Sequence, residues 1–481
     1  MIDDEKIRRT IERALEHWRV PGGAVSIRRG GRKLYEGCFG VKRLGERARI
    51  GKHTQFDIGS VSKTFNAAAM ALLVEEGRLA WDTRAIDVLP EFRLADPAIA
   101  EQVTMRDLIA HRIGHGEDAI TNYSSHFTRA EILAQMRVLP LRAPFRSETC
   151  YQSYGPLAAA AVVERLSGLS WEDYVEARIL KPLGLADAAP TYERLRNKRA
   201  SSSPHADFGR GVEAMAHRDF SNLAPAGSMV ASLADLASWA DIHANRGLGF
   251  LKPATLGEMF TPHSLVHPRG ISPVRWHSRF AATIVSYGLG WYVHDFIGHR
   301  VVEHTGALEG YIALVIVVPE ERLGIVILTN LHQTPAPLAL RYALLSLCLG
   351  GPERDWIALA EAKLRAIPKA RPLADGTPYY YRPIGRRQGT KPSVPLRALA
   401  GRYRHGGYGD IAVTFARGRL KADIVGNACD LEHWHWNEFR AVPKDRGVKL
   451  YYKELFLRFA ADGAGALTRL VIPSLAEFRR R

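Results

Sequence analysis

The stretch YIALVIVVPEERLGIVILTN, residues 311–330, contains two nearly continuous apolar runs on either side of a charged segment, residues 319–322. Apolar runs of this length, rich in valine and isoleucine, are typical of strands that are buried on both faces of a sheet. Pro319 and the charged residues after it favour a turn between the two runs. The stretch therefore predicts two adjacent, buried strands.

A second pair of strands is predicted near the N-terminus. The segment GGAVSIRRGGRKLYEGCFG, residues 22–40, has an apolar run, a Gly30-Gly31 turn and a second run, which is the pattern of a β-hairpin. Because an isolated hairpin is at best marginally stable in water, we expect both pairs of strands to belong to one sheet.

Helical patterns occupy most of the chain around these strands. Ile7, Ile11 and Leu15 recur at helical spacing, so a helix is predicted at the N-terminus. An apolar segment that ends at Gly168 and a segment that begins at Ser232 predict two more helices, since glycine commonly ends helices and serine commonly caps them. Strands and helices together indicate a protein of the mixed α/β (α+β) class.

The last quarter of the chain has a different pattern. Residues 368–395 contain six prolines, which is typical of a linker. Beyond them, short alternating or aromatic runs such as LEHWHWNEFRAV and VKLYYKELFLRFA alternate with turn residues, which predicts a small antiparallel, barrel-like β domain. The expected domains are residues 1–350, a helix and proline-rich linker over 351–395, and residues 396–481.

Composition narrows the class of protein. The 481 residues are 46% hydrophobic, as in globular proteins. The net charge is +16, and residues 371–481 alone contain 21 basic against 10 acidic residues. Because no nucleic-acid-binding motif accompanies this charge, we expect a basic surface and no nucleic-acid partner.

Compartment and membrane contact are predicted from the same composition. No stretch approaches the roughly 18 apolar residues of a membrane-spanning helix, and no signal-peptide pattern begins the chain. The four cysteines are far apart and form no C-x-x-C motif. We therefore expect reduced thiols, a cytoplasmic location and no membrane partner.

The segment DIGSVSKTFN, residues 57–66, contains the motif S-x-x-K at Ser60 and Lys63. The residues that follow are rich in helix formers, and residues i and i+3 of a helix lie on the same side. Ser60 would then lie beside Lys63 at a helix N-terminus, where a neutral lysine can accept the serine proton. By itself the motif is a weak signal and favours a capping serine beside a surface lysine.

Two other segments favour a catalytic role. CYQSYGPL places Tyr151 and Ser153 before an apolar helix, and VEHTGALEGY places His304, Thr305 and Gly306 before the later strand pair. In this order the three motifs resemble those of the serine β-lactamase and penicillin-recognising enzyme family, namely S-x-x-K, Y-x-N and K-T-G or H-x-G.

The resemblance is closest to the branch of class C β-lactamases, D-aminopeptidases and family VIII esterases. It covers roughly residues 5–345 and includes the stretches MRDLIAHRIGHG, APAGSMVASLADLASW and YGLGW. It implies an antiparallel sheet flanked by helices, with an inserted helical region, as in β-lactamases and DD-peptidases. The C-terminal domain is similar to the lipocalin-like barrels of some D-aminopeptidase-like members.

The resemblance also implies roles for the motif residues. Ser60 is the expected nucleophile, which forms an acyl-enzyme, and Lys63 and Tyr151 are expected to move its proton, with either as the base. The backbone N–H groups of Ser60 and Ala307 are expected to form the oxyanion hole. The expected substrate-binding residues are Ser153, His304, Thr305 and Gly306.

Two positions depart from the family pattern. Ser153 replaces an asparagine and offers one hydroxyl in place of an amide. His304 replaces a lysine, so a permanent charge becomes a ring that is largely neutral at pH 7. Both changes point away from β-lactams and toward small peptides, amides or esters.

The expected function is a serine hydrolase of D-aminopeptidase, amidase or esterase type, with weak or absent β-lactamase activity. An acyltransferase or peptide cyclase that uses the same acyl-enzyme, and a non-catalytic binding or sensor protein, are the alternatives. We expect no cofactor and no metal, since Cys429, His433 and His435 lack a second pair of ligands. The expected partner is a small molecule or short peptide, and the oligomeric state is left open.

Overall fold

The computed structural model describes residues 3–116, 127–266, 282, 284–365, 385–451, 455–463, 465–473 and 475–481. The chain divides into two compact units. Unit 1 consists of Met1–Phe92, Ala100–Gly114 and Pro144–Ile367, and unit 2 consists of Arg93–Ile99, His115–Ala143 and Pro368–Arg481.

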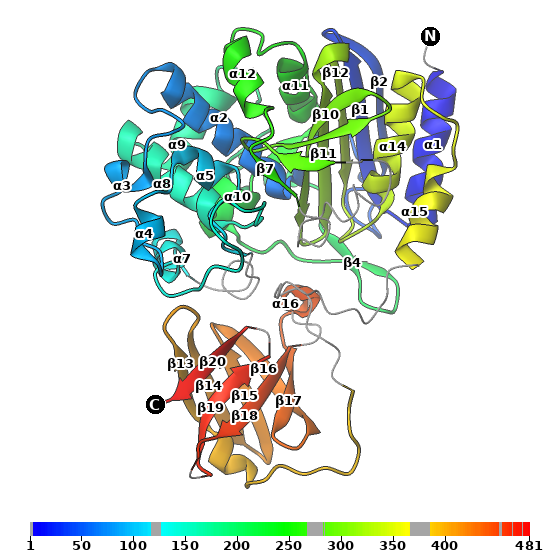
Figure 1. The fold of residues 1–481 in the computed structure, drawn as a ribbon. Coiled ribbons are helices and arrows are strands. Elements are labelled where there is room, and N and C mark those ends of the chain that lie inside the picture. Colours follow the sequence, from blue (N-terminus) through cyan, green and yellow to red (C-terminus); the bar gives the residue numbers. More distant parts are fainter. Residues whose placement is uncertain are drawn as a thin grey trace. The chain divides into compact units, whose positions relative to one another are not determined.

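An eight-stranded antiparallel sheet forms the centre of unit 1 (Figure 1). Strand β1 pairs with β12 from Gly23 opposite Thr329 to Arg29 opposite Leu323, so the two predicted strand pairs are neighbours in one sheet, as expected. In spatial order the strands are β2 Arg32–Gly40, β1 Gly22–Arg29, β12 Leu323–Thr329, β11 Tyr311–Val318, β10 His299–Leu308, β9 Tyr292–Phe296, β8 Val285–Tyr287 and β7 Ser264–Leu265.

Helices cover both faces of this sheet (Figure 1). Ile325 and Ile327 of β12 belong to the core beneath α1 Asp4–His17, α14 Ala336–Leu349 and α15 Trp356–Arg365. On the opposite face Gly324 lies against Ala240 of α11 Leu233–Ala244. Burial on both faces explains why the runs in residues 311–330 are almost entirely apolar.

A helical region is inserted between β3 Gln55–Asp57 and β6 Val230–Ser232, which pair with each other. Gly168 ends α8 in the left-handed conformation, with φ of 74°, and Ser232 caps α11 through the Asp235 N–H, as predicted. The helices of unit 1 in this region are α2 Ser62–Glu75, α3 Ala85–Val88, α5 Met105–Ile109, α8 Tyr154–Ser167, α9 Trp171–Val175 and α10 Ala224–Gly227.

The chain also forms shorter elements outside the barrel, of which α7 belongs to unit 2. They are the 3-10 turns η1 Gly59–Val61, η3 Tyr192–Arg194, η4 Lys198–Ala200 and η5 Ser221–Leu223, the π turn η2 Glu176–Leu180, the hairpin β4 His205–Asp207 and β5 Val212–Ala214, and the helices α4 Pro97–Ala100, α7 Arg129–Gln135 and α12 Pro253–Met259. The turn η6 Pro319–Glu321 joins β11 to β12.

Unit 2 contains a closed antiparallel barrel of eight strands (Figure 1), which agrees with the predicted small β-barrel. The strands are β13 Gly401–His405, β14 Gly409–Ala416, β15 Arg419–Ile424, β16 Asn427–His435, β17 Glu438–Pro443, β18 Phe456–Ala461, β19 Leu467–Ile472 and β20 Ala476–Arg480. The turn η7 Leu396–Leu399 precedes β13.

One predicted strand of the barrel is wrong in its first part. The run VKLYYKELFLRFA was expected to be extended, but helix α16 covers Arg446–Tyr451, and β18 begins only at Phe456. The Asp445 side chain accepts a hydrogen bond from the Val448 N–H at 2.9 Å, which caps the helix. A capping aspartate therefore outweighs the β propensity of the aromatic residues.

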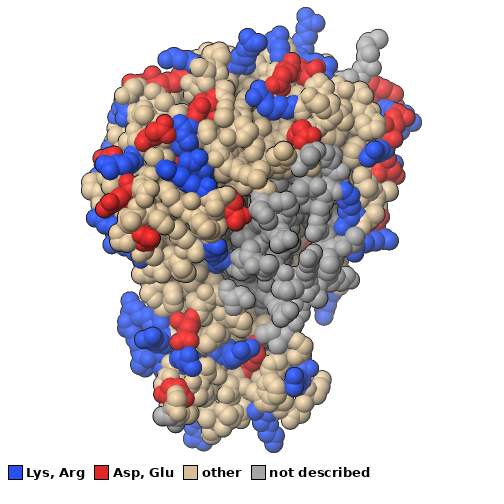
Figure 2. Space-filling model, viewed as in Figure 1, with Lys and Arg blue, Asp and Glu red and all other residues tan. Residues whose placement is uncertain are grey.

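Charged side chains are dispersed over the surface that Figure 2 presents. Lysine and arginine are interspersed with aspartate and glutamate over the visible face of unit 1. Among the helices that the structure describes, none is both long enough and apolar enough to cross a membrane.

Candidate active site

Ser60 and Lys63 meet at the junction between η1 and α2. The Lys63 Nζ lies 3.3 Å from the Ser60 Oγ, and it also donates a hydrogen bond to the Ala226 carbonyl oxygen at 2.6 Å. Both side chains are buried, with relative exposures of 8% for Ser60 and 2% for Lys63. The carbonyl of Ala226 comes from α10, so two separate segments of the helical region fix the ammonium group.

The ring of Tyr151 lies close to Lys63. The Lys63 Nζ is 4.7 Å from the centroid of the Tyr151 ring. That ring is buried, stacks on Tyr292 of β9 with centroids 6.0 Å apart, and lies 4.5 Å from the ring of His111. The structure thus brings the three predicted catalytic residues together. Ser60 comes from η1, Lys63 from the start of α2 and Tyr151 from the segment before α8.

Strand β10 approaches η1 backbone to backbone. A Cβ added to Gly59 would lie 2.6 Å from the Ala307 nitrogen, and one added to Gly306 would lie 3.0 Å from the Ser60 nitrogen. Gly59 also has a positive φ of 51°, which other residues rarely adopt. Glycine at both positions therefore lets the backbone N–H groups of Ser60 and Ala307 come close to each other.

His304 is fully enclosed beside Tyr151. Its Nε2 lies 2.8 Å from the Tyr287 hydroxyl, and its Nδ1 lies 2.8 Å from the Thr305 carbonyl oxygen. Burial raises the pKa of Tyr287 well above its usual value, so this hydroxyl is protonated. Nδ1 donates to the carbonyl oxygen, because a carbonyl oxygen can only accept, so both ring nitrogens of His304 are bonded to the protein.

Thr305 lies on the opposite face of β10 from His304, because side chains alternate along a strand. Its hydroxyl accepts a hydrogen bond from Arg341 of α14 at 3.0 Å. The Arg341 Nε also lies 3.0 Å from the Glu303 carboxylate, and both of these side chains are buried. The Thr305 hydroxyl therefore forms its hydrogen bond on the α14 side of the sheet.

Ser153 is the residue before α8 and is buried, with 1% exposure. Its hydroxyl does not cap the helix. Instead, the Gln152 side chain accepts a hydrogen bond from the Gly155 N–H at 2.7 Å. The Ser153 hydroxyl is thus not required for the helix end.

Four residues around the site had no role in the interpretation of the sequence, although three of them lie in stretches that carry the family resemblance. His111 lies in MRDLIAHRIGHG, Ala226 in APAGSMVASLADLASW and Tyr287 in YGLGW. Tyr292 follows YGLGW directly. The family stretches identified the right segments of the chain. The contacts of these four residues with Tyr151 and Lys63 join distant parts of the sequence, so only the structure reveals them.

Two possible metal ligands of the barrel, His433 and His435, form hydrogen bonds with other residues of the barrel. A β-bulge interrupts β16 between His433 and His435. His433 lies 2.9 Å from the Trp436 carbonyl oxygen, and His435 lies 3.1 Å from the Glu438 carboxylate. Within the described ranges there is no group of three or more side chains that could hold a metal ion.

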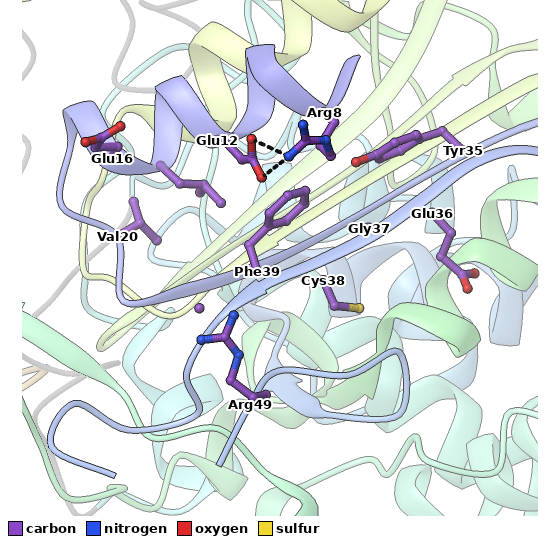
Figure 3. Close-up of a pocket in the computed structure, with 12 residues that line it drawn as sticks. Arg8, Glu12, Glu16, Val20, Tyr35, Glu36, Gly37, Cys38, Phe39 and Arg49 are labelled. Carbon is purple, nitrogen blue, oxygen red and sulfur yellow. Dashed lines mark hydrogen bonds and ion pairs between the residues drawn. The ribbon is translucent and has the colours of Figure 1, made fainter. Parts of the chain in front are cut away.

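A surface recess of about 600 Å³ lies between α1 and β2 (Figure 3). Figure 3 shows the ion pair of Arg8 and Glu12 along its helical wall, with Phe39 and Tyr35 on the strand side. Ser60, Lys63 and Tyr151 are not among the residues that line it. The recess is therefore separate from the candidate active site.

The chain is similar to several named proteins. A relative from Aspergillus violaceofuscus, "Unguisins hydrolase ungD", is 25% identical over 455 residues, which cover 87% of this chain and 78% of that protein. "Penicillin-binding protein 4" from Amycolatopsis lactamdurans is 28% identical over 314 residues, which cover 65% of this chain and 81% of that protein.

Solved structures share the fold. The octameric penicillin-binding protein homologue from Pyrococcus abyssi matches with a TM-score of 0.64 and 18% identity, over 99% of both chains. A D-stereospecific amidohydrolase from a Streptomyces species matches with a TM-score of 0.59 and 22% identity, over 73% of this chain and all of the other.

Two family profiles match the chain in succession. A domain of unknown function (DUF3471) matches residues 385–480. The Beta-lactamase family matches residues 7–347, which is well over half of the sequence. The chain therefore belongs to the β-lactamase family, whose fold is that of the penicillin-binding proteins.

Proposed function

We propose that the protein is a serine hydrolase that forms an acyl-enzyme on Ser60. The observation that carries the proposal is the position of the Lys63 Nζ, 3.3 Å from the Ser60 Oγ and 4.7 Å from the Tyr151 ring centroid, in a buried environment. When Lys63 is neutral, one N–H can still donate to Ala226 while the lone pair accepts the serine proton. Such an arrangement is the general requirement for an activated hydroxyl nucleophile.

The charge that develops during attack needs donors close to Ser60. Attack of the Ser60 Oγ on a carbonyl carbon places negative charge on the carbonyl oxygen. The Ser60 and Ala307 N–H groups, which the two glycines bring close to each other, are the proposed donors. Lys63 or the Tyr151 hydroxyl then returns the proton to the leaving group, and water releases the acyl group.

The proposed substrates are small peptides, amides or esters, including D-configured ones. His304 is buried, and its two nitrogens are bonded to Tyr287 and to the backbone, so it offers no fixed positive charge to a carboxylate. Ser153 lacks the amide that orients the side chain of a β-lactam. A relative named as an unguisins hydrolase supports hydrolysis, and a structural neighbour named as a D-stereospecific amidohydrolase supports amide substrates.

A fluorophosphonate probe tests the nucleophile. Intact-protein mass spectrometry of the wild type should show one adduct, which is absent in Ser60→Ala. Lys63→Ala should react at least about 100-fold more slowly, since general-base catalysis typically contributes that much. Ser62→Ala is the matched control, because the Ser62 hydroxyl is bonded to the Gly59 carbonyl and the Met229 N–H instead of facing Lys63.

The outcome is decisive for Ser60. An adduct that persists in Ser60→Ala, or one that disappears in Ser62→Ala while that variant is folded by circular dichroism, would overturn the assignment. Absence of any adduct on the wild type, together with no turnover of esters or amides, would favour a non-catalytic scaffold.

Substrate preference is tested by comparing p-nitrophenyl acetate with nitrocefin on one preparation. We expect a higher kcat/KM for the ester. A missing charge-assisted hydrogen bond costs about 1.5–3 kcal/mol, or roughly 10- to 150-fold, and a missing neutral one about 0.5–1.5 kcal/mol; the β-lactam lacks one of each here. Ser153→Asn should raise nitrocefin turnover. A wild type that prefers nitrocefin would show that our interpretation of Ser153 and His304 is wrong.

A further inference from the structure

His111 contacts the chain on both sides of Tyr151. Its carbonyl oxygen accepts a hydrogen bond from the Cys150 N–H at 2.9 Å. Its ring Nδ1 accepts one from the Gln152 N–H at 3.4 Å. Between these bonds, the rings of His111 and Tyr151 lie 4.5 Å apart, so one residue fixes the backbone before Tyr151, the backbone after it and its ring.

The backbone of His111 is held in an unusual conformation. Its φ is 55°, in the left-handed region that non-glycine residues seldom occupy. The side chain is fully buried and also lies 4.7 Å from the ring of Tyr287. A strained, buried residue persists only where the surrounding structure fixes it, and such residues cluster at functional sites.

His111 is a neutral ring. Because Nδ1 accepts from a backbone N–H, the single ring proton is on Nε2. Burial holds the pKa of His111 well below its usual value, and the nearby Lys63 and His304 lower it further. Nε2 is buried without a hydrogen-bond partner in the described part of the chain. His111 therefore does not exchange protons at neutral pH, and its contribution is geometric.

We propose that His111 is a positioning residue that keeps the Tyr151 ring against Lys63. The inference rests on the proposed acyl-enzyme function and goes beyond it, because it assigns the placement of Tyr151 to a residue that touches neither Ser60 nor a substrate. Displacement of a catalytic group by about 1 Å can cost roughly 100-fold in rate. Loss of the His111 contacts should therefore lower kcat and leave KM nearly unchanged.

Three substitutions of His111 distinguish loss of the Nδ1 hydrogen-bond acceptor from a change in side-chain volume. Asparagine tolerates the left-handed backbone, and its Oδ1 takes the place of Nδ1, so His111→Asn should keep kcat within about 5-fold of the wild type. Leucine and glutamine offer no acceptor at that place. His111→Leu and His111→Gln should lower kcat about 30- to 100-fold while KM changes less than about 3-fold. If His111→Leu does not fold, His111→Gln serves in its stead.

A double-mutant cycle with Tyr151→Phe tests whether His111 acts through Tyr151. If it does, the loss caused by His111→Gln in the wild type should shrink to less than about 3-fold when Tyr151 has already lost its hydroxyl. His243→Leu is the matched control. His243 is an equally buried histidine whose Nδ1 lies 2.8 Å from the Trp239 carbonyl oxygen, and its removal should lower stability without lowering kcat.

The readouts keep this inference distinct from the proposed function. If the wild type is not labelled on Ser60 and does not turn over esters, the proposed function fails whatever His111 does. If the wild type is labelled and active, the positioning role is overturned by additive losses in the cycle, by His111→Asn losing as much kcat as His111→Gln, or by unchanged kcat in all three variants.

Discussion

Asp57, three residues before Ser60, has a carboxyl group enclosed by the protein, with only 6% exposure. Burial, with a smaller effect of Glu309, raises the pKa of Asp57 to about 8. Burial also lowers the pKa of His217 to about 4. The two side chains lie 3.3 Å apart, so at pH 7 their contact joins a protonated carboxyl group and a neutral imidazole and is not an ion pair.

The pH dependence of folding should reveal this protonated carboxyl group. Folded Asp57 keeps its proton up to about pH 8, whereas an unfolded aspartate releases it near pH 4. The wild type should therefore lose folding free energy, relative to Asp57→Asn, by about 1 kcal/mol per pH unit between pH 6.5 and 8. His217 is present in both proteins, so its own titration largely cancels.

Urea unfolding of the two proteins at pH 6.5, 7.2 and 8 measures this difference. If the stability of the wild type relative to Asp57→Asn stays constant or grows with pH, the folded pair holds no extra proton, so Asp57 is ionised beside a neutral His217 and its pKa is not raised.

At the scale of elements, the site depends on how closely η1 and β10 approach. Gly59→Ala should separate them, because the added Cβ would lie 2.6 Å from the Ala307 nitrogen at a backbone φ of 51°. We expect kcat/KM for p-nitrophenyl acetate to fall about 100- to 1000-fold, the usual cost of losing an oxyanion-hole donor.

Gly257→Ala is the control for this substitution. Gly257 lies within α12 with open space around its Cα, so alanine there should leave kcat/KM unchanged and stabilise the helix by about 0.5–1 kcal/mol. Near-normal turnover by a folded Gly59→Ala variant would show that the close approach of η1 and β10 is not needed for catalysis.

The sequence predicted elements best where the determining interactions are local. The S-x-x-K spacing follows helix geometry, and Ser60 and Lys63 do meet. By contrast, the composition of helix α2 did not reveal that α8, α9 and α10 pack around it and that most of its side chains are buried. The position of Thr305 in its motif gave no sign of the hydrogen bond from Arg341, which is a contact between distant segments.

At the scale of the whole molecule, apolar runs and turn residues made β1, β2, β11 and β12 of the central sheet and most of the barrel predictable, whereas β7, β8, β9 and β10 were not predicted. Strand β20 was not predicted, since AEFRR has few apolar residues and depends on pairing with β13 and β19. The proline-rich linker lies mostly outside the described residues, and the boundaries at residues 350 and 395 stay predictions. The grouping of residues 115–143 with the barrel has no signature in the sequence.

That grouping can be tested through Leu139, which is buried in unit 2 with 4% exposure. A Cβ added to Gly407, in the turn between β13 and β14, would lie 2.8 Å from the Leu139 Cδ2, so the turn packs directly on this side chain. Leu139→Asp buries an unpaired charge and should destabilise the packing by about 2–4 kcal/mol. Ala134, an exposed residue of α7, is the control, and Ala134→Asp should have little effect on the barrel. Hydrogen exchange followed by mass spectrometry should then show faster exchange in β13 and β14 of Leu139→Asp, with β11 and β12 of the central sheet unchanged. Equal loss of protection in the sheet would show that the two units unfold together, and unchanged protection in the barrel would show that residues 115–143 are not part of its packing.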